Sequence, residues 1–138
     1  MTPPTRDEIA AYLEDIKQSV RAGRYRIALN ENRRDNLQLR VDYVISSDDV
    51  RNILLSLETD DFSEKRQNEH AGYENEWLYI FGKAVPLIER FGTGEKTVPL
   101  YIKFNKLRNL FVIVISFHEQ KHPLFYPFKQ MTDKDFLS

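Results

Sequence analysis

Two runs of alternating side chains in the C-terminal half constrain the fold more than any other feature. Residues 97–105 and 110–117 are rich in β-branched and aromatic side chains, and a short segment, Lys106-Leu107-Arg108-Asn109, separates them. This pattern is typical of a β-hairpin. If Asn105 pairs with Leu110, one face is wholly apolar, carrying Val98, Leu100, Ile102, Phe104, Phe111, Ile113, Ile115 and Phe117. Such a face must be buried, so we expect helices to cover it.

The opposite face of the predicted hairpin is mixed and includes Tyr101, Lys103, Ser116 and His118. Polar groups held on rigid strands are suited to a binding or catalytic site. In this register His118 lies opposite Thr97, which puts its backbone roughly 13 Å from that of Tyr101. We therefore expect Tyr101 and His118 to approach a substrate from two sides, with Lys103 further away.

Two helices are indicated by their N-terminal signals. Thr5-Arg6-Asp7-Glu8 has the capping-box pattern, and apolar residues follow it at helical spacing until Gly23, a plausible stop. Ser46-Ser47-Asp48-Asp49 precedes a second, short amphipathic helix that ends before Asp60-Asp61. Between them, residues 24–30 alternate Arg with apolar side chains, which fits either a strand or a helix running on through Asn36.

The remaining segments complete an α+β prediction. Residues 63–76 are polar and predict a loop with one edge strand, and residues 77–81 predict an aromatic-rich strand. Residues 82–96 contain Pro86, Gly92 and Gly94 and predict an excursion from the sheet. Helices that precede strands indicate an antiparallel sheet with N-terminal helices packed on one face. Residues 123–138 form a tail, with Leu124, Phe125, Tyr126 and Phe128 docked and residues 132–138 loose.

Composition narrows the class of protein. A chain of 138 residues predicts one domain over 1–138, and the absence of Cys excludes disulfides, Cys-ligated metals and a thiol nucleophile. The polar start and the lack of a long apolar run predict a cytoplasmic protein with no membrane partner. Residues 1–82 carry 11 Lys and Arg against 16 Asp and Glu, and residues 83–138 carry 9 against 5. Basic patches are therefore local. They allow a polyanion partner, but charge alone favours an ordinary solvated surface.

The candidate chemistry lies where the second strand ends, at His118-Glu119-Gln120-Lys121-His122. Histidine exchanges protons near neutral pH, so the segment is suited to acid–base work on a phosphodiester. Lys121, Lys65 and Arg66 are candidates for offsetting phosphate charge. A metal hydrolase using His70, His118 and His122 is an alternative, although their spacing matches no metal-ligand motif. Trp77, Tyr79 and Phe81 form either an RNA stacking platform or part of the core.

An ordered set of residues resembles one family. A short helix ends in Leu57, and Asp61-Phe62, Trp77, Tyr101-Ile102-Lys103 and Ile115-Ser116-Phe117-His118-Glu119 follow. This order, over roughly residues 48–120, is similar to that of the MqsR-type toxins of bacterial toxin–antitoxin pairs, which are small RNases with a RelE-like α+β fold. The resemblance implies metal-independent cleavage of mRNA, no cofactor, and neutralisation by a cognate antitoxin protein.

The resemblance also assigns roles by position. The family's functional tyrosine falls on Tyr101, and its lysine at the end of the last strand falls on His118. The family also has a lysine soon after Asp-Phe, and the nearest match in this chain, Lys65, comes one position later. The family's glutamine just after Trp falls on Leu78. The predicted catalytic residues are therefore His118, Tyr101 and Lys65. The predicted RNA-binding residues are Lys121, Arg66, Lys103, Ser116 and His122. The alternative is a non-enzymatic module that binds nucleic acid or protein on the same fold.

Overall fold

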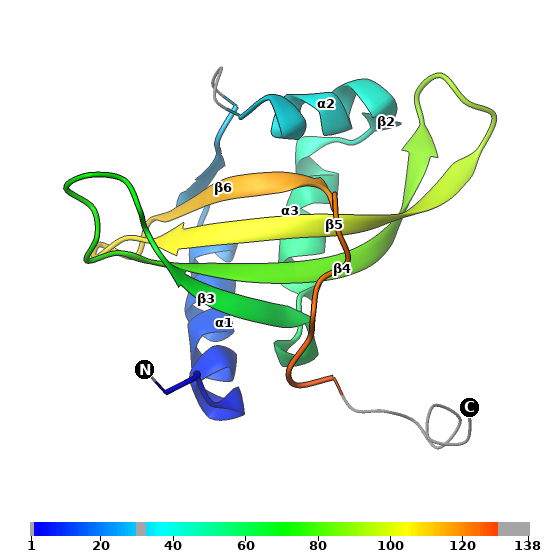
Figure 1. Ribbon diagram of the computed structural model, residues 1–138. Coiled ribbons are helices and arrows are strands. Elements are labelled where there is room, and N and C mark those ends of the chain that lie inside the picture. Colours follow the sequence, from blue (N-terminus) through cyan, green and yellow to red (C-terminus); the bar gives the residue numbers. More distant parts are fainter. Residues whose placement is uncertain (1, 30–32, 130–138) are drawn as a thin grey trace, which may run out of the picture.

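The described part of the chain folds as three helices and a curled mixed sheet (Figure 1). The computed structural model describes residues 2–29 and 33–129, so the predicted loose segment 132–138 lies outside the described residues. The helices are α1 (Arg6–Arg21), α2 (Arg34–Asp42) and α3 (Ser47–Ser56), with a 3-10 turn, η2 (Thr59–Asp61). The strands are β1 (Tyr25–Ile27), β2 (Tyr43–Val44), β3 (Phe62–Gln67), β4 (Trp77–Glu89), β5 (Glu95–Lys106) and β6 (Val112–Glu119).

The sheet has the strand order β1-β6-β5-β4-β2, and β3 pairs with the first part of β4. Every pair is antiparallel except β1 with β6, which is parallel. The α+β prediction is confirmed, and the antiparallel prediction holds for all but that one pair. The short strand β1 also decides between the two readings of residues 24–30 in favour of a strand.

Helices α1 and α3 cover one face of the sheet, while α2 lies along β6 (Figure 1). The predicted apolar positions of α1 are buried, as are Val50 and Leu54 of α3. Both predicted helix starts are confirmed, because Thr5 Oγ1 accepts from the Glu8 N–H at 3.1 Å and Ser46 forms a reciprocal capping box with Asp49. Among the described residues, no helix combines the length and apolarity needed to span a membrane.

The predicted excursion at residues 82–96 is wrong. Strand β4 continues to Glu89, and β5 begins at Glu95, so the two form a long hairpin closed by a hydrogen bond from Glu89 N–H to Gly94 O. Pro86 is tolerated because β3 pairs with β4 only through Phe81 and β2 only from Ile88. On that side of β4 no strand needs the N–H that proline lacks.

The predicted register of the β5–β6 hairpin is also wrong. Lys106 pairs with Val112, so the turn spans residues 107–111 rather than four residues. A β-bulge follows, since Phe104 pairs with Val114 while Lys103 pairs with Ser116, which leaves Ile115 as the extra residue. Val112 and Val114 are therefore the buried residues near the turn, in place of the predicted Phe111, Ile113 and Ile115. Beyond the bulge Phe117 points inward, as predicted.

The bulge is held by one side chain from α2. Asn36 is buried, and its Nδ2 donates to Ile115 O at 2.9 Å and to Ala28 O at 2.7 Å. Its Oδ1 accepts from the Phe117 N–H at 2.8 Å. A bulge leaves backbone groups that the neighbouring strand does not pair, and buried groups of that kind are costly unless satisfied. Asn36 thus stabilises the bulge and joins α2 and the end of β1 to β6.

We expect Asn36→Ala to lower the free energy of unfolding by about 2 kcal/mol or more, because it leaves several buried backbone groups unpaired. Urea unfolding measures this change. Gln38→Ala is the matched control, since Gln38 lies exposed on the same helix and its side chain donates to Asp42 Oδ1, also exposed on that helix. Equal stability of the two variants would contradict the role given to Asn36.

Candidate functional site

The face of the sheet opposite α1 and α3, here called the outer face, presents the predicted polar residues in cross-strand rows. One row is Gly82, Tyr101 and His118, and the next is Ile80, Lys103 and Ser116. Strand β3 adds Glu64 to the second row, beside Ile80, and Arg66 to the following row, beside Leu78. The bulge at Ile115 shifts β6 so that His118 lies directly opposite Tyr101, and the predicted separation of these two residues is wrong.

Tyr101 and His118 form a stacked pair. Their ring centroids lie 5.1 Å apart with an interplanar angle of 11°. His118 Nδ1 lies 2.8 Å from the backbone oxygen of Glu119, and a carbonyl only accepts, so Nδ1 carries the proton and Nε2 is the free acceptor of the neutral ring. Burial raises the pKa of Tyr101, and Glu64 adds to this effect while Arg66 opposes it. Tyr101 therefore stays protonated at neutral pH, and its hydroxyl is able to donate a hydrogen bond.

A pocket of about 360 Å³ lies over this pair. Its walls contain the predicted residues Tyr101, Lys103, Ser116, His118, Lys121 and His122, together with Arg33, Asp35, Pro123 and Leu124. Lys103 was expected to lie further away, and the bulge brings it into the same pocket by pairing it with Ser116. Six of the eight predicted site residues thus line one pocket.

Charge in the pocket is organised around Lys103. Burial lowers its pKa, and Arg33 and Arg66 lower it further, while Glu64 works in the opposite direction. Positive charges in a cluster repel one another, and an anion that binds among them offsets this repulsion. Lys121 is already paired with Asp35, whose Oδ2 lies 2.8 Å from Nζ, and this hydrogen bond lowers the pKa of Asp35.

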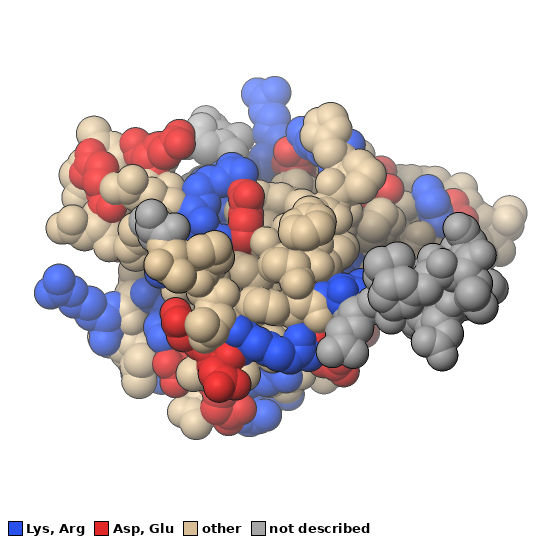
Figure 2. Space-filling model, turned by 60° about the horizontal axis from the view of Figure 1, so that its bottom comes forward, with Lys and Arg blue, Asp and Glu red and all other residues tan. Residues whose placement is uncertain are grey.

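A second pocket of about 360 Å³ continues the first along the sheet and shares Arg33 and Lys103 with it. Arg66, Asn68, Glu69, His70, Leu78 and Ile115 line it, along with Gln67. We call the two pockets together the outer groove. Basic side chains in the groove are accompanied by Asp35 and Glu69, and Figure 2 likewise shows Lys and Arg interspersed with Asp and Glu on the side of the molecule that it views. Any anion is therefore bound by local groups rather than by a uniform basic surface.

Lys65 is a predicted catalytic residue whose side chain does not line the outer groove. Its Nζ lies 4.8 Å from the Trp77 ring centroid and 5.6 Å from that of Tyr79, on the helix-covered side of the sheet. Neighbouring residues of a strand point to opposite faces, so Arg66 reaches the outer groove and Lys65 does not. The prediction of Lys65 as a catalytic partner of His118 is not supported by this placement.

Two groove residues with basic side chains, Arg33 and His70, were absent from the predicted site. Arg33 belongs to a basic stretch that the sequence shows plainly, but only the contact of α2 with β6 brings that stretch to the groove. His70 lies in a different pocket from His118 and His122, so the three histidines do not converge. Within residues 2–29 and 33–129, no three His, Asp or Glu side chains gather as a metal site would require.

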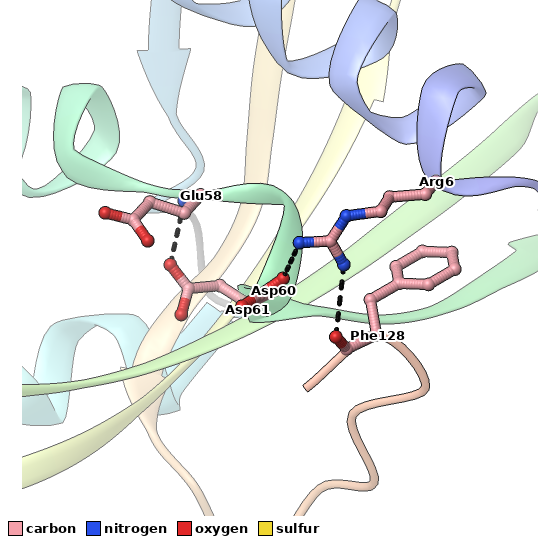
Figure 3. A network of polar contacts seen from close by, with 5 residues as sticks. All are labelled: Arg6, Glu58, Asp60, Asp61 and Phe128. Atoms are coloured by element: carbon pink, nitrogen blue, oxygen red, sulfur yellow. Dashed lines mark hydrogen bonds and ion pairs between the residues drawn. The ribbon is translucent and has the colours of Figure 1, made fainter. Parts of the chain in front are cut away.

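The described part of the C-terminal tail, residues 123–129, borders the groove and is held to the rest of the protein at two places. Gln120 Nε2 donates to Leu100 O at 3.0 Å and to the Tyr126 hydroxyl at 3.1 Å. Further along, Arg6 pairs with Asp60 and donates to Phe128 O at 3.1 Å (Figure 3). The predicted docking holds for Leu124, Tyr126 and Phe128, which are half-buried, but Phe125 is 78% exposed.

Comparison with protein-family models finds no match, and neither the curated proteins nor the solved structures include one that is significantly similar to this chain. The function is therefore argued from the groove itself.

We expect Gly82→Ala to displace the tail, because a Cβ at this position would lie 2.3 Å from the Tyr126 hydroxyl and 2.7 Å from Leu124 Cδ1. The contacting atoms are ends of side chains, so the tail should move while the sheet stays folded. Amide NMR shifts of residues 120–126 report the displacement. Gly94→Ala is the control, since a Cβ there meets nothing within 4 Å. Unchanged tail shifts in Gly82→Ala would refute the close packing.

Proposed function

We propose that the outer groove binds single-stranded RNA and cleaves it without a metal ion, and that the protein is a cytoplasmic toxin-type endoribonuclease acting on mRNA. The observation that carries this proposal is the stacked Tyr101–His118 pair inside a pocket that also holds Lys103, Arg33 and His122. These are the groups required when a ribose 2′-hydroxyl attacks the adjacent phosphate: a base, an acid and fixed positive charge. The similarity in residue order to the MqsR-type toxins supports the same activity.

His118 is assigned as the base. Its Nε2 accepts the proton of the ribose 2′-hydroxyl, whose oxygen then attacks the adjacent phosphorus. The bond from phosphorus to the 5′ oxygen breaks, and that oxygen takes a proton from His122 in its imidazolium form. The products are a 2′,3′-cyclic phosphate and a 5′-hydroxyl, so protons and bonds balance.

The remaining groups act on charge and position. Lys103 and Arg33 lie beside the reacting phosphate and offset the charge that develops on its oxygens. The protonated Tyr101 donates a hydrogen bond and holds the His118 ring by stacking. Arg66 lies in the neighbouring pocket and contacts the next phosphate of the strand.

Replacing His118 by Ala should slow cleavage of a single-stranded RNA by about 10²–10⁴-fold, the usual cost of one acid–base group. The assay uses purified protein with EDTA present, and expression of the wild type, but not of His118→Ala, should arrest bacterial growth. Circular dichroism of the variant checks its fold. Cleavage by His118→Ala at the wild-type rate would remove His118 from the mechanism.

The neighbouring residues Arg66 and Lys65 offer a matched pair for RNA binding. Arg66→Ala should lower the affinity for RNA severalfold, because its side chain lies in the groove. The slope of log K against log salt concentration should fall in magnitude by about 1, the effect of losing one phosphate contact. Lys65→Ala should leave both unchanged, because Lys65 lies on the opposite face. Fluorescence anisotropy with a labelled RNA oligonucleotide measures both quantities. Equal losses in the two variants would contradict the assignment of faces.

A non-enzymatic RNA-binding module is the second candidate. It is favoured by the groove wall at Leu78, where the similar family has a glutamine, and by the removal of Lys65 from the site. Tight RNA binding without cleavage products would select this function. Growth arrest that is rescued by the product of a neighbouring reading frame would instead select the toxin and identify its antitoxin partner.

A further inference from the structure

The second pocket of the outer groove has room for a part of the substrate that the proposed reaction does not use. Besides Arg33 and Lys103, which both pockets share, the reaction draws only Arg66 from it. Its volume of about 360 Å³ lies within the range of small-molecule sites, roughly 300–1,000 Å³. Leu78 and the half-buried Ile115 give its wall an apolar part.

Glu69 supplies the one carboxylate among the described residues that line this pocket. It lies in the loop that joins β3 to β4 (Figure 1), between Asn68 and His70. The Asn68 N–H donates to Glu76 O at 2.9 Å, and Asn68 Nδ2 donates to Glu76 Oε1 at 3.1 Å. Asn68 Oδ1 accepts from the His70 N–H at 3.0 Å. The backbone on both sides of Glu69 is therefore fixed before a ligand binds, which lowers the entropy cost of binding.

The Glu69 carboxylate is available to a ligand. The residue is exposed, and its side chain makes no hydrogen bond or ion pair within residues 2–29 and 33–129. Two other carboxylates of the outer face are already paired, Glu64 with Arg66 and Asp35 with Lys121. A free carboxylate accepts hydrogen bonds and repels phosphate groups. The end of the pocket near Glu69 therefore suits an uncharged donor group better than the backbone of a nucleic-acid strand.

The edges of the nucleobases differ in what they offer to a carboxylate. Cytosine, adenine and guanine each carry an exocyclic amino group, and Glu or Asp side chains accept from such groups when proteins read bases. Uracil has no amino group, and carbonyl oxygens lie on both sides of its single N–H, so a carboxylate is repelled by its edge. The apolar side chains of Leu78 and Ile115 suit the face of a base, whichever base it is.

We propose that the second pocket holds one base of the RNA strand and that Glu69 selects bases with an exocyclic amino group over uracil, an inference that rests on the function proposed above. Arg33 and Lys103 line both pockets, so this base belongs to a nucleotide next to the reacting phosphate. Its phosphate lies among the basic side chains of the groove, and its edge points toward the β3–β4 loop. Glu69 thereby determines sequence preference and takes no part in the proton transfers at His118.

Binding to short oligonucleotides tests the inference. The probes are fluorescein-labelled strands of 2′-fluoro uridine, which lack the attacking hydroxyl, with or without one central cytosine. Because the uridines are identical, the strand can slide until the cytosine reaches Glu69. Fluorescence anisotropy should show about 5- to 10-fold tighter binding of the cytosine strand, the effect of one hydrogen bond. A strand in which 2-pyrimidinone, which is cytosine without its amino group, replaces the cytosine should lose this advantage.

Glu69→Gln is the variant that isolates the carboxylate. The side chain keeps its size, but its amide can donate to O4 of uracil as well as accept from an amino group, so the preference for cytosine should disappear. Glu69 is exposed, so the variant should fold, and circular dichroism checks this. Glu95→Gln is the matched control, because it removes the same charge from an exposed residue that lines neither pocket of the groove, and it should keep the preference.

Two results would overturn the inference: the wild type binds both strands equally, or Glu69→Gln keeps the preference for cytosine. In either case, cleavage of natural RNA that depends on His118 would leave the proposed function standing. A Glu69-dependent preference for cytosine in a protein that does not cleave RNA would reject the nuclease and assign the base site to a binding module. A protein that binds none of the strands would reject both proposals.

Discussion

The hydrogen bonds of Asn36 are the interaction on which the rest of the arrangement depends. This side chain satisfies the carbonyl of Ile115, the extra residue of the β6 bulge, and the N–H of Phe117, which lies two residues further along. Because of the bulge, the β6 side chains that face the helices are Val112 and Val114 on the turn side and Phe117 on the far side, and His118 lies opposite Tyr101. The packing of α2, the inward side chains of β6 and the geometry of the candidate site therefore all depend on Asn36, a residue of α2 and not of the sheet.

Local patterns predict the parts of this fold that local chemistry determines. Thr5 and Ser46 begin helices because their side chains satisfy nearby N–H groups, and the signal needs only a few adjacent residues. The register of the hairpin has a different origin. It depends on a contact between residues 36 and 117, and a one-residue slip exchanges the faces of a strand. The pattern of side chains in residues 110–117 does not reveal the bulge. The sequence therefore predicted Phe111 and Ile113 to face the helices, whereas Val112 and Val114 do so.

The same reasoning explains the candidate site. The site residues of β5 and β6 were recognised because Tyr, His and Lys stand out in apolar strands, and most of them do line one pocket. Lys65 and Arg66 are chemically alike and adjacent, and their separation to opposite faces is set by the pairing of β3 with β4, where the register shifts between Phe62 and Glu64. Arg33 reaches the groove only through the packing of α2 on β6, which no short pattern encodes.

The segment from Arg33 to Asn36 combines roles that are usually kept apart in a protein. Arg33 lines the groove, Asp35 pairs with Lys121 at its rim, and Asn36 holds the strand that presents His118. A substitution in this segment changes architecture and surface chemistry together. In a screen scored by activity alone, variants of Asn36 would be indistinguishable from variants of the reacting groups, and only a parallel measure of folded protein would separate the two kinds of defect.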